Sequence, residues 1–284
     1  MVQNSVIDVS LIISFYNDTH WLNLIFAALE KQSYKSFEVI IADDGSGEEA
    51  QHFIAKAKKE RSFPIQHEWH EDEGWRKNII LNKAIVASKS PYLIFIDGDC
   101  IPHKHFIKEH YIHRAEETIL AGRRVNLSAR ISKNITATKI QKGYLEGWLT
   151  TKLFLHKFFF HDGTHPENGI YISSRLIRSR LNRKKNKGIL GSNFSLYKKD
   201  ILALNGFDER YLLPAVGEDT DINQRAVFAG LRVKTLKHLA LQYHKHHEKL
   251  IRDERNLQIL QQTIDDKLSF TPYGIIKDEK YGSM

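Results

Sequence analysis

The first hundred residues alternate four times between short apolar runs and segments of helical spacing, and this alternation constrains the fold more than any other feature. The apolar runs predict strands at 8–14, 37–41, 65–69 and 91–96. Strands that alternate with helices form a mostly parallel sheet flanked by helices, so we expect an α/β fold. Right-handed crossovers bring the carboxyl ends of the strands to one edge, where ligands bind in open α/β sheets.

Acidic residues follow two of these strands, as DGD at 97–99 and DDGS at 43–46. In extended geometry the side chains of Asp97 and Asp99 point the same way, so both can face one site. Neighbouring carboxylates repel unless a cation lies between them, and Mg²⁺ and Mn²⁺ prefer such oxygen ligands. Taken alone, DGD is more often a solvated turn, and Asp44 is as well suited to a turn that caps the next helix as to a nucleoside contact.

The composition is that of an ordinary globular protein, and it excludes two classes. The single cysteine, Cys100, rules out an internal disulfide scaffold. Residues 1–8 lack the pattern of a signal peptide, and the most apolar stretch, 148–160, is too short for a membrane span. The net charge of +8 over 284 residues indicates an anionic partner, such as nucleic acid, an acidic membrane or a phosphorylated small molecule.

Polar clusters elsewhere have both a structural and a functional interpretation. Arg76 is a surface cation or a guanidinium for a diphosphate. The acids of GEDTD at 217–221 cap a helix, or project one carboxylate as a general base. The histidines at 244–247 form an exposed polar face or ligate a transition ion. The basic run 175–187 is a solvated loop or contacts a phosphate-bearing acceptor or an anionic membrane.

The second half of the chain is less regular. We expect helices at 133–160, 198–204 and 218–229 and strands at 188–196 and 231–235, and then a polar C-terminal helix with little to hold it.

With these residues laid out, the chain resembles family 2 glycosyltransferases of the GT-A fold from Val9 to His247. Its first half is similar to their nucleotide-sugar-binding half in SFYN, ADDGS, DEGWRKNIILNKA and YLIFIDGDCIP. GILGSNFSLYKKDILALNGFDERY and GEDTDINQRAVFAGLRV resemble the C-terminal region of galactosyltransferases and bacterial chondroitin-type polymerases. The resemblance implies one catalytic domain, 1–247, with a nucleotide-sugar half (1–102), an acceptor half (103–247) and a helical extension (248–284).

The resemblance also implies a role for each matching residue. The residues implied to bind the donor nucleotide-sugar are Phe15, Asn17, Asp44, Arg76, Asn82, Asp97, Gly191, Ser192 and Asn193. Asp99, the second acid of the DXD motif, would coordinate Mn²⁺ or Mg²⁺ together with His244 or His247. Asp219 would be the catalytic base, with Glu218 beside it, and Glu218 and Asp221 would bind the acceptor.

The implied activity is an inverting, metal-dependent transfer of a hexose or N-acetylhexosamine from a UDP-sugar to a hydroxyl of a glycan or lipid-linked acceptor. The implied context is bacterial capsule or lipopolysaccharide synthesis, in the cytoplasm or at the cytoplasmic face of the inner membrane, with no nucleic acid partner. Thr220 replaces a third acid and 212–216 replaces a Trp-Gly lid, so we do not carry over the family's acceptor preference. A single transferase unit implies addition of one sugar.

Two alternatives remain open. A sugar-phosphate nucleotidyltransferase typically has a Gly-rich loop after the first strand, and residues 14–18 contain no glycine. A non-catalytic module that binds glycan or nucleic acid would fit the basic run. The acids at the strand ends argue against such a module because they repel phosphates without a metal.

Overall fold

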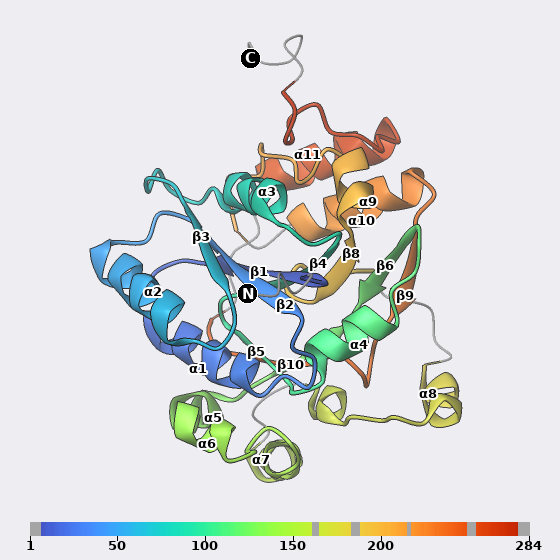
Figure 1. The fold of residues 1–284 in the computed structure, drawn as a ribbon. Coiled ribbons are helices and arrows are strands. Elements are labelled where there is room, and N and C mark those ends of the chain that lie inside the picture. The colour runs from blue at the N-terminus through green and yellow to red at the C-terminus, as the bar shows by residue number, and fades with distance from the viewer. Residues whose placement is uncertain (1–6, 161–164, 183–187, 215–216, 249–253, 278–284) are drawn as a thin grey trace, which may run out of the picture.

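The computed structural model describes residues 7–160, 165–182, 188–214, 217–248 and 254–277, and its centre is a seven-stranded sheet (Figure 1). The strand order is β3-β2-β1-β4-β8-β6-β9. The strands in this order are Ile65–Trp69, Phe37–Asp43, Val9–Phe15, Tyr92–Asp97, Phe194–Tyr197, Thr118–Ala121 and Arg232–Thr235. The first four are parallel, β8 is antiparallel to both neighbours, and β9 is parallel to β6. The α/β prediction is confirmed.

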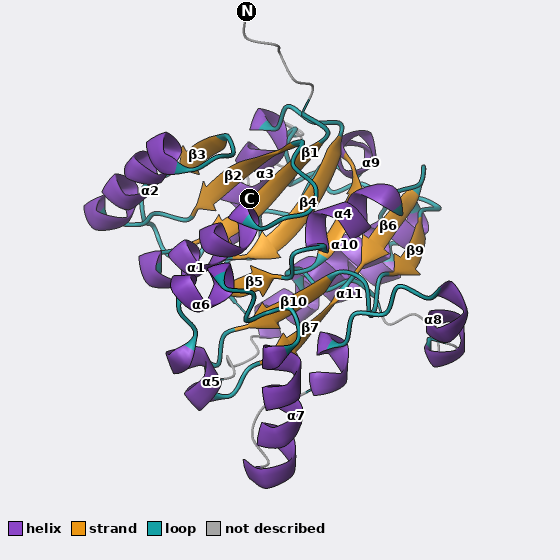
Figure 2. Ribbon diagram, turned by 60° about the horizontal axis from the view of Figure 1, so that its bottom comes forward, coloured by secondary structure: helices purple, strands orange, loops and turns teal. Residues whose placement is uncertain are grey.

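A second, three-stranded sheet lies beside the carboxyl ends of the central strands (Figure 2). It consists of β5 (Cys100–Pro102), β10 (Leu241–His244) and β7 (Arg123–Asn126). In it β10 pairs antiparallel with β5 and parallel with β7. This sheet joins the DGD turn to the second half of the chain.

Helices cover both faces of the central sheet. One face packs against α1 (Thr19–Glu30), α2 (Glu48–Glu60) and α4 (Phe106–Ile112), and the other against α3 (Lys77–Ala87), α9 (Lys198–Ala203) and α10 (Glu218–Phe228). In β1, Leu11 and Ile13 belong to one apolar cluster and Ile12 to the other. Successive strand residues point to opposite faces, and both faces are buried, so the strand reads as a continuous apolar run.

The registers align the strand ends as predicted. Ser14 of β1 lies opposite Ala42 of β2 and Asp97 of β4. The residues that follow these strands therefore lie at one edge.

Two predicted elements of the second half are wrong in extent. The segment 133–160 is not one helix but three, α5 (Ala129–Asn134), α6 (Ala137–Gln141) and α7 (Trp148–Phe160). Gly143 and Gly147, with φ of 86° and 137°, turn the chain between α6 and α7. The strand predicted at 188–196 is confined to β8. Two short helices follow α7, namely η1 (Pro166–Gly169) and α8 (Arg175–Leu181).

Within the described residues, no helix is both long and apolar enough to cross a membrane. Residues 183–187 of the basic run and 215–216 of the segment that replaces the family's lid lie outside the described part of the chain.

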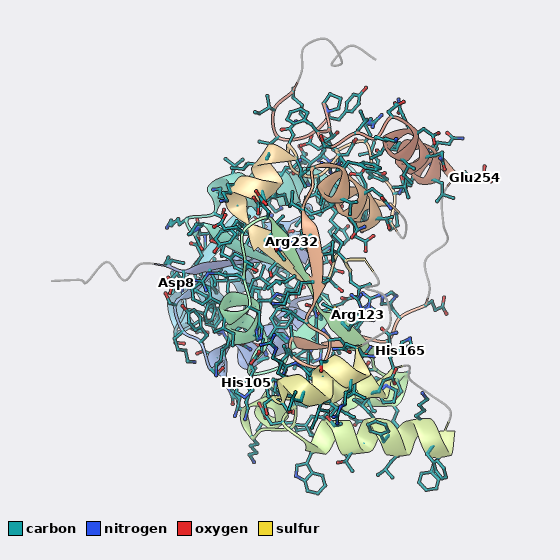
Figure 3. All side chains as sticks on the ribbon, turned by 90° about the vertical axis from the view of Figure 1, so that its right-hand side faces the viewer. Asp8, His105, Arg123, His165, Arg232 and Glu254 are labelled. Carbon is teal, nitrogen blue, oxygen red and sulfur yellow. The ribbon has the colours of Figure 1, made fainter. Side chains whose placement is uncertain are left out.

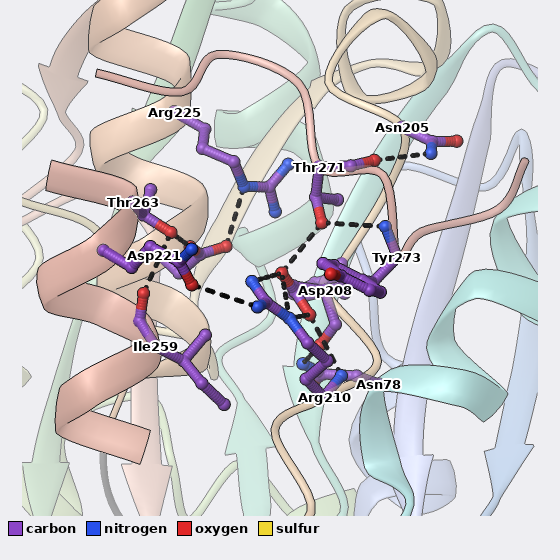
Figure 4. Close-up of polar contacts among 12 residues, drawn as sticks. Asn78, Asn205, Asp208, Arg210, Asp221, Arg225, Ile259, Thr263, Thr271 and Tyr273 are labelled. Atoms are coloured by element: carbon purple, nitrogen blue, oxygen red, sulfur yellow. Dashed lines mark hydrogen bonds and ion pairs between the residues drawn. The ribbon is translucent and has the colours of Figure 1, made fainter. Parts of the chain in front are cut away.

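The C-terminal helix α11 (Glu254–Asp265) is held more firmly than predicted (Figure 4). It packs on α10, where Thr263 Oγ1 donates to Asp221 Oδ1 at 2.9 Å. Beyond it, Asn205 bonds the backbone of Thr271 and Ile276, and Thr271 Oγ1 donates to Asp208. The polar side chains of this region are therefore used in packing.

Asp221 belongs to this network, and its predicted role in acceptor binding is corrected. Its carboxylate lies 2.7 Å from Nε of Arg225, and both side chains are only 1% exposed. The Arg225 guanidinium also donates to the carbonyl oxygens of Leu204 and Gly206. Asp221 therefore holds α10 to α11 and to the turn after α9.

We expect Asp221→Ala to lower the free energy of unfolding by about 3–5 kcal/mol, because it leaves the Arg225 guanidinium buried without its carboxylate. Urea denaturation followed by circular dichroism measures the effect. Asp266→Ala, at an exposed position just after α11, is the control and should change stability by less than about 0.5 kcal/mol. Equal stability of the two variants would contradict the structural role of Asp221.

Candidate active site

A cavity of about 520 Å³ opens where β1, β2 and β4 end. That volume lies within the usual range of ligand pockets. Its lining includes Phe15, Asp44, Lys77, Asp97, Asp99 and His247. A Cβ on Gly98 would lie 2.7 Å from the carbonyl oxygen of Ser14, so only glycine allows β1 to approach the DGD turn this closely.

At one end of the cavity, Asp99 meets two histidines. Its Oδ2 lies 3.1 Å from His244 Nε2 and 3.5 Å from His247 Nε2, and the two Nε2 atoms are 3.1 Å apart. Pairing of β10 with β5 places His244 opposite Cys100, and this pairing brings the imidazole to Asp99. Burial raises the pKa of Asp99, but hydrogen bonds from His244 and His247 outweigh burial and hold that pKa well below its usual range. In return, the Asp99 carboxylate raises the pKa of His247.

These groups fit a divalent ion. One carboxylate oxygen and two imidazole nitrogens converge, and Mn²⁺ accepts both donor types. Cys100 Sγ is also close to Asp99 and His244. Burial raises the pKa of the Cys100 thiol, which donates to Asp99 Oδ1 at 3.1 Å, so it stays protonated and is a poor ligand.

The other acid of the DGD turn has a different partner. Lys77 Nζ lies 2.8 Å from Asp97 Oδ1 and 3.8 Å from Glu218 Oε1. Burial lowers the pKa of Lys77, but Asp97 and Glu218 together raise it above its usual value. Burial raises the pKa of Glu218, and Lys77 opposes that rise. One ammonium group thus joins the strand end of β4 to the start of α10.

Asp219 lies next to this cluster in the first turn of α10. The backbone N–H of Gly191 donates to its Oδ2 at 3.0 Å, and Thr220 Oγ1 lies 3.3 Å from its Oδ1. A Cβ on Gly191 would lie 3.3 Å from that of Asp219, so the loop and the helix are in close contact. The loop 190–192 therefore orients the Asp219 carboxylate.

Asp44, which follows β2, lines the cavity beside Phe15, whose carbonyl oxygen accepts from the Asp44 N–H. Its carboxylate lies 2.7 Å from His70 Nε2 and accepts from the backbone N–H of Arg76 at 2.9 Å. Burial raises the pKa of Asp44 despite these bonds. The neighbouring Asp43 is fully buried against His67 and faces away from the cavity.

The prediction for Arg76 is corrected. Its guanidinium bonds Glu73 and the carbonyl oxygen of Glu71, so only its backbone reaches Asp44. The next residue, Lys77, lines the cavity instead. The sequence could not show which of Arg76 and Lys77 faces the cavity, because the two cations are consecutive at the start of α3.

Two of the three asparagines predicted to bind the donor are used by the fold instead. Asn82 pairs with the backbone of Phe207 through both ends of its amide, at 2.8 and 2.9 Å. Asn193 is fully buried and donates to the carbonyl oxygens of Arg123 and Ala240. The amides of Asn82 and Asn193 thus hold the backbone of distant segments. Asn17 is exposed, and its Oδ1 accepts from the N–H of Gly47 in the turn after β1, so its role toward the donor stays a prediction.

Of the other residues predicted to bind the donor, Gly191 contacts Asp219 and Ser192 follows it in the same loop. Ser192 is buried, and its Oγ accepts from Arg124 at 3.3 Å. Sequence reasoning missed Lys245, which follows His244, lines the cavity and pairs with Asp18.

Comparison with known proteins agrees with this geometry. Residues 10–202 match the family model described as Glycosyl transferase family 2, and residues 175–249 match the model described as N-terminal domain of galactosyltransferase. The chondroitin synthase of Pasteurella multocida is 28% identical over 138 residues, which are 47% of this chain and 14% of that protein. The chain spans between 13% and 26% of the length of the curated relatives it matches.

Solved structures with the same fold include residues 1–349 of S. aureus TarS, with a TM-score of 0.56, 16% identity and coverage of 92% of this chain and 65% of that chain. Another is a mannosyltransferase from Pyrobaculum calidifontis in complex with GDP-Man and Mn²⁺, with a TM-score of 0.52 and 13% identity. The match covers 83% of this chain and 56% of that chain. The GT-A fold prediction is therefore confirmed. The family matches favour a transferase over both alternatives.

We expect Asp99→Asn and His244→Ala each to weaken Mn²⁺ binding at least about tenfold, because each removes a ligand or its charge. Calorimetry with Mn²⁺ and UDP measures the affinity. His52→Ala, at an exposed position on α2, is the matched control. Wild-type affinity in both site variants would show that the ion binds elsewhere.

Proposed function

Because the chain belongs to glycosyl transferase family 2, we propose that it is an inverting, metal-dependent transferase acting on a UDP-sugar. It moves a hexose or N-acetylhexosamine to a hydroxyl of a glycan or lipid-linked acceptor. The observation that carries this proposal is the convergence of Asp99, His244 and His247 at one cavity, which Asp97 and Lys77 also line. Lys77 Nζ lies 3.8 Å from Glu218 Oε1, at the start of the helix that carries Asp219. The cavity thus has groups for a cation and for an anionic leaving group, and the acids of α10 lie next to it.

The donor would lie along the strand ends. Phe15 and Asp44 would contact the nucleoside, because both line the cavity and the N–H of Asp44 donates to the carbonyl oxygen of Phe15. Asp99, His244 and His247 would hold Mn²⁺ or Mg²⁺, which as a Lewis acid would neutralise charge on the departing diphosphate. Lys77 supplies a positive charge in the same cavity, held by Asp97, which would stabilise developing anionic charge.

Asp219 acts as the general base. Its carboxylate is oriented by Gly191 and stands beside Glu218, so it can accept the proton of an acceptor hydroxyl. The hydroxyl oxygen bonds to the anomeric carbon as the bond to the UDP oxygen breaks, and UDP leaves with that electron pair. A single displacement from the opposite face inverts the configuration, so an α-linked donor gives a β-linked product.

We further propose that the enzyme builds a bacterial surface polysaccharide at the cytoplasmic face of the inner membrane. Support comes from α7 and α8, at the end of the molecule away from α11 (Figure 3). On α7, Trp148 is 73% exposed, Phe158 76% and Phe159 64%. The two helices carry two lysines and three arginines and no acidic residue. Exposed aromatic rings among cations suit an anionic lipid surface.

In the presence of Mn²⁺, we expect the purified protein to release UDP from one of four donors: UDP-Gal, UDP-GalNAc, UDP-Glc or UDP-GlcNAc. Addition of EDTA should stop this release. Asp219→Asn should lower turnover by about 10²–10⁴-fold, because it removes the base. Its affinity for UDP with Mn²⁺ should stay within about twofold, since Asp219 lies outside the metal cluster.

Asp266→Asn, the same chemical change at an exposed position, is the control for both measurements. Loss of UDP binding in folded Asp219→Asn would contradict its assignment as the base. Release from GDP-mannose alone would overturn the UDP proposal.

We expect the protein to co-sediment with vesicles of mixed phosphatidylglycerol and phosphatidylcholine, but not with vesicles of phosphatidylcholine alone. The triple variant of Trp148, Phe158 and Phe159 to Ala should reduce the bound fraction severalfold, because it removes the insertable rings. Phe270→Ala removes an exposed ring outside α7 and α8, and it should bind like wild type. Equal binding to both kinds of vesicle would contradict charge-assisted docking.

A further inference from the structure

A second cavity, of about 530 Å³, is as large as the first and has no part in the function proposed so far. Its walls come from β7, η1, the end of α8, the loop 188–190 and the segment after β9. The side chains that matter here are those of Arg123, Arg124, Glu167, Asn168 and Lys237. Its size lies within the usual range of ligand pockets.

Positive charge dominates the described lining of this cavity. Arg123, Arg124 and Lys237 face a single acid, Glu167, which already lies 3.1 Å from the imidazole of His165. Among the described residues, the Arg124 guanidinium bonds only Ser192 Oγ, at 3.3 Å, and no ion pair involves Lys237. Most of the five N–H donors of Arg124 and the three of Lys237 are therefore available to a ligand.

The cations stand on fixed backbone. Asn168 donates to the carbonyl oxygen of Arg124 at 3.0 Å, and Asn193 donates to that of Arg123 at 3.2 Å. Pairing of β7 with β10 also fixes this strand. A guanidinium on such a support binds an anion with little further ordering.

The second cavity lies beside the loop that orients Asp219. Arg124 bonds Ser192, one residue from the Gly191 that holds Asp219. Its charge also lowers the pKa of His247, whose larger shift upward comes from Asp99. Ile189 and Leu190, in the wall of the second cavity, lead directly to Gly191. A saccharide in this cavity could thus extend a hydroxyl towards Asp219.

We propose that this cavity binds the acceptor, and that the acceptor is a saccharide bearing an anionic group, a carboxylate or a phosphate. Arg124 and Lys237 pair with the anion. This inference rests on the proposed transferase function and names its acceptor class. The described lining contains no Phe, Tyr or Trp, so it lacks the stacking surface on which single-stranded nucleic acids depend.

The test is binding of three small saccharides to the full chain saturated with UDP and Mg²⁺, measured by calorimetry. The probes are methyl β-D-glucuronide, glucose 6-phosphate and the neutral methyl β-D-glucoside. We expect at least one anionic probe to bind about tenfold or more tightly than the neutral one, because charged hydrogen bonds contribute most. The preferred anionic probe distinguishes a carboxylate from a phosphate.

Lys237→Gln and Arg124→Gln should each lower the affinity for the preferred anionic probe about fivefold or more. Each should also remove much of the preference for that probe over the neutral glucoside. Lys234→Gln is the matched control, because Lys234 is an exposed lysine of β9 outside the cavity. Lys237→Gln should also keep wild-type affinity for UDP, since Lys237 does not line the first cavity.

Equal or absent binding of charged and neutral probes, or binding that neither cavity variant changes, would overturn the inference. Failure of the wild type to bind UDP would instead refute the transferase proposal. The two failures are therefore distinguishable.

Discussion

The antiparallel pairing of β10 with β5 is the contact on which the site depends. It places His244 opposite Cys100, and the N–H of Lys245 donates to the carbonyl oxygen of Asp99 at 2.9 Å. A turn of the first half and a strand near the end of the chain are thus joined by backbone hydrogen bonds. Because the backbone holds both partners, the carboxylate and the imidazoles already converge, and an ion that binds them has little ordering to impose.

Buried charge organises the rest of the site in pairs. Lys77 lies between Asp97 and Glu218, and Arg225 pairs with Asp221 one turn further along α10. Such pairs add little net stability, but an unpaired member would be costly. Of the first group, Lys77 and Asp97 line the cavity. The second is sealed by α11 and positions the helix that carries Asp219. Neighbouring acids of one motif therefore serve chemistry and architecture separately.

The two cavities differ in charge. The first combines Asp44, Asp97 and Asp99 with His247 and two lysines. The second is mainly cationic. Arg124, in the lining of the second, bonds Ser192 in the loop that orients Asp219. The short strands and loops of the second half thus form the second cavity and orient Asp219, while the ends of the parallel strands form much of the first. Under the proposed function, the first cavity would take the donor and the second the acceptor.

The sequence alone determined the parallel core and the placement of the acids, because an apolar run buried on both faces is a local property and strand ends follow from it. Asp99, Asp219 and the histidines were indicated through the family resemblance of their motifs, since Asp in a turn is by itself common. The sequence did not separate ligand-facing side chains from structural ones. Asn82 binds the backbone of Phe207, and Lys77 rather than Arg76 faces the cavity. Only the tertiary structure decided these roles, because the partner that satisfies a buried polar group comes from a distant part of the chain.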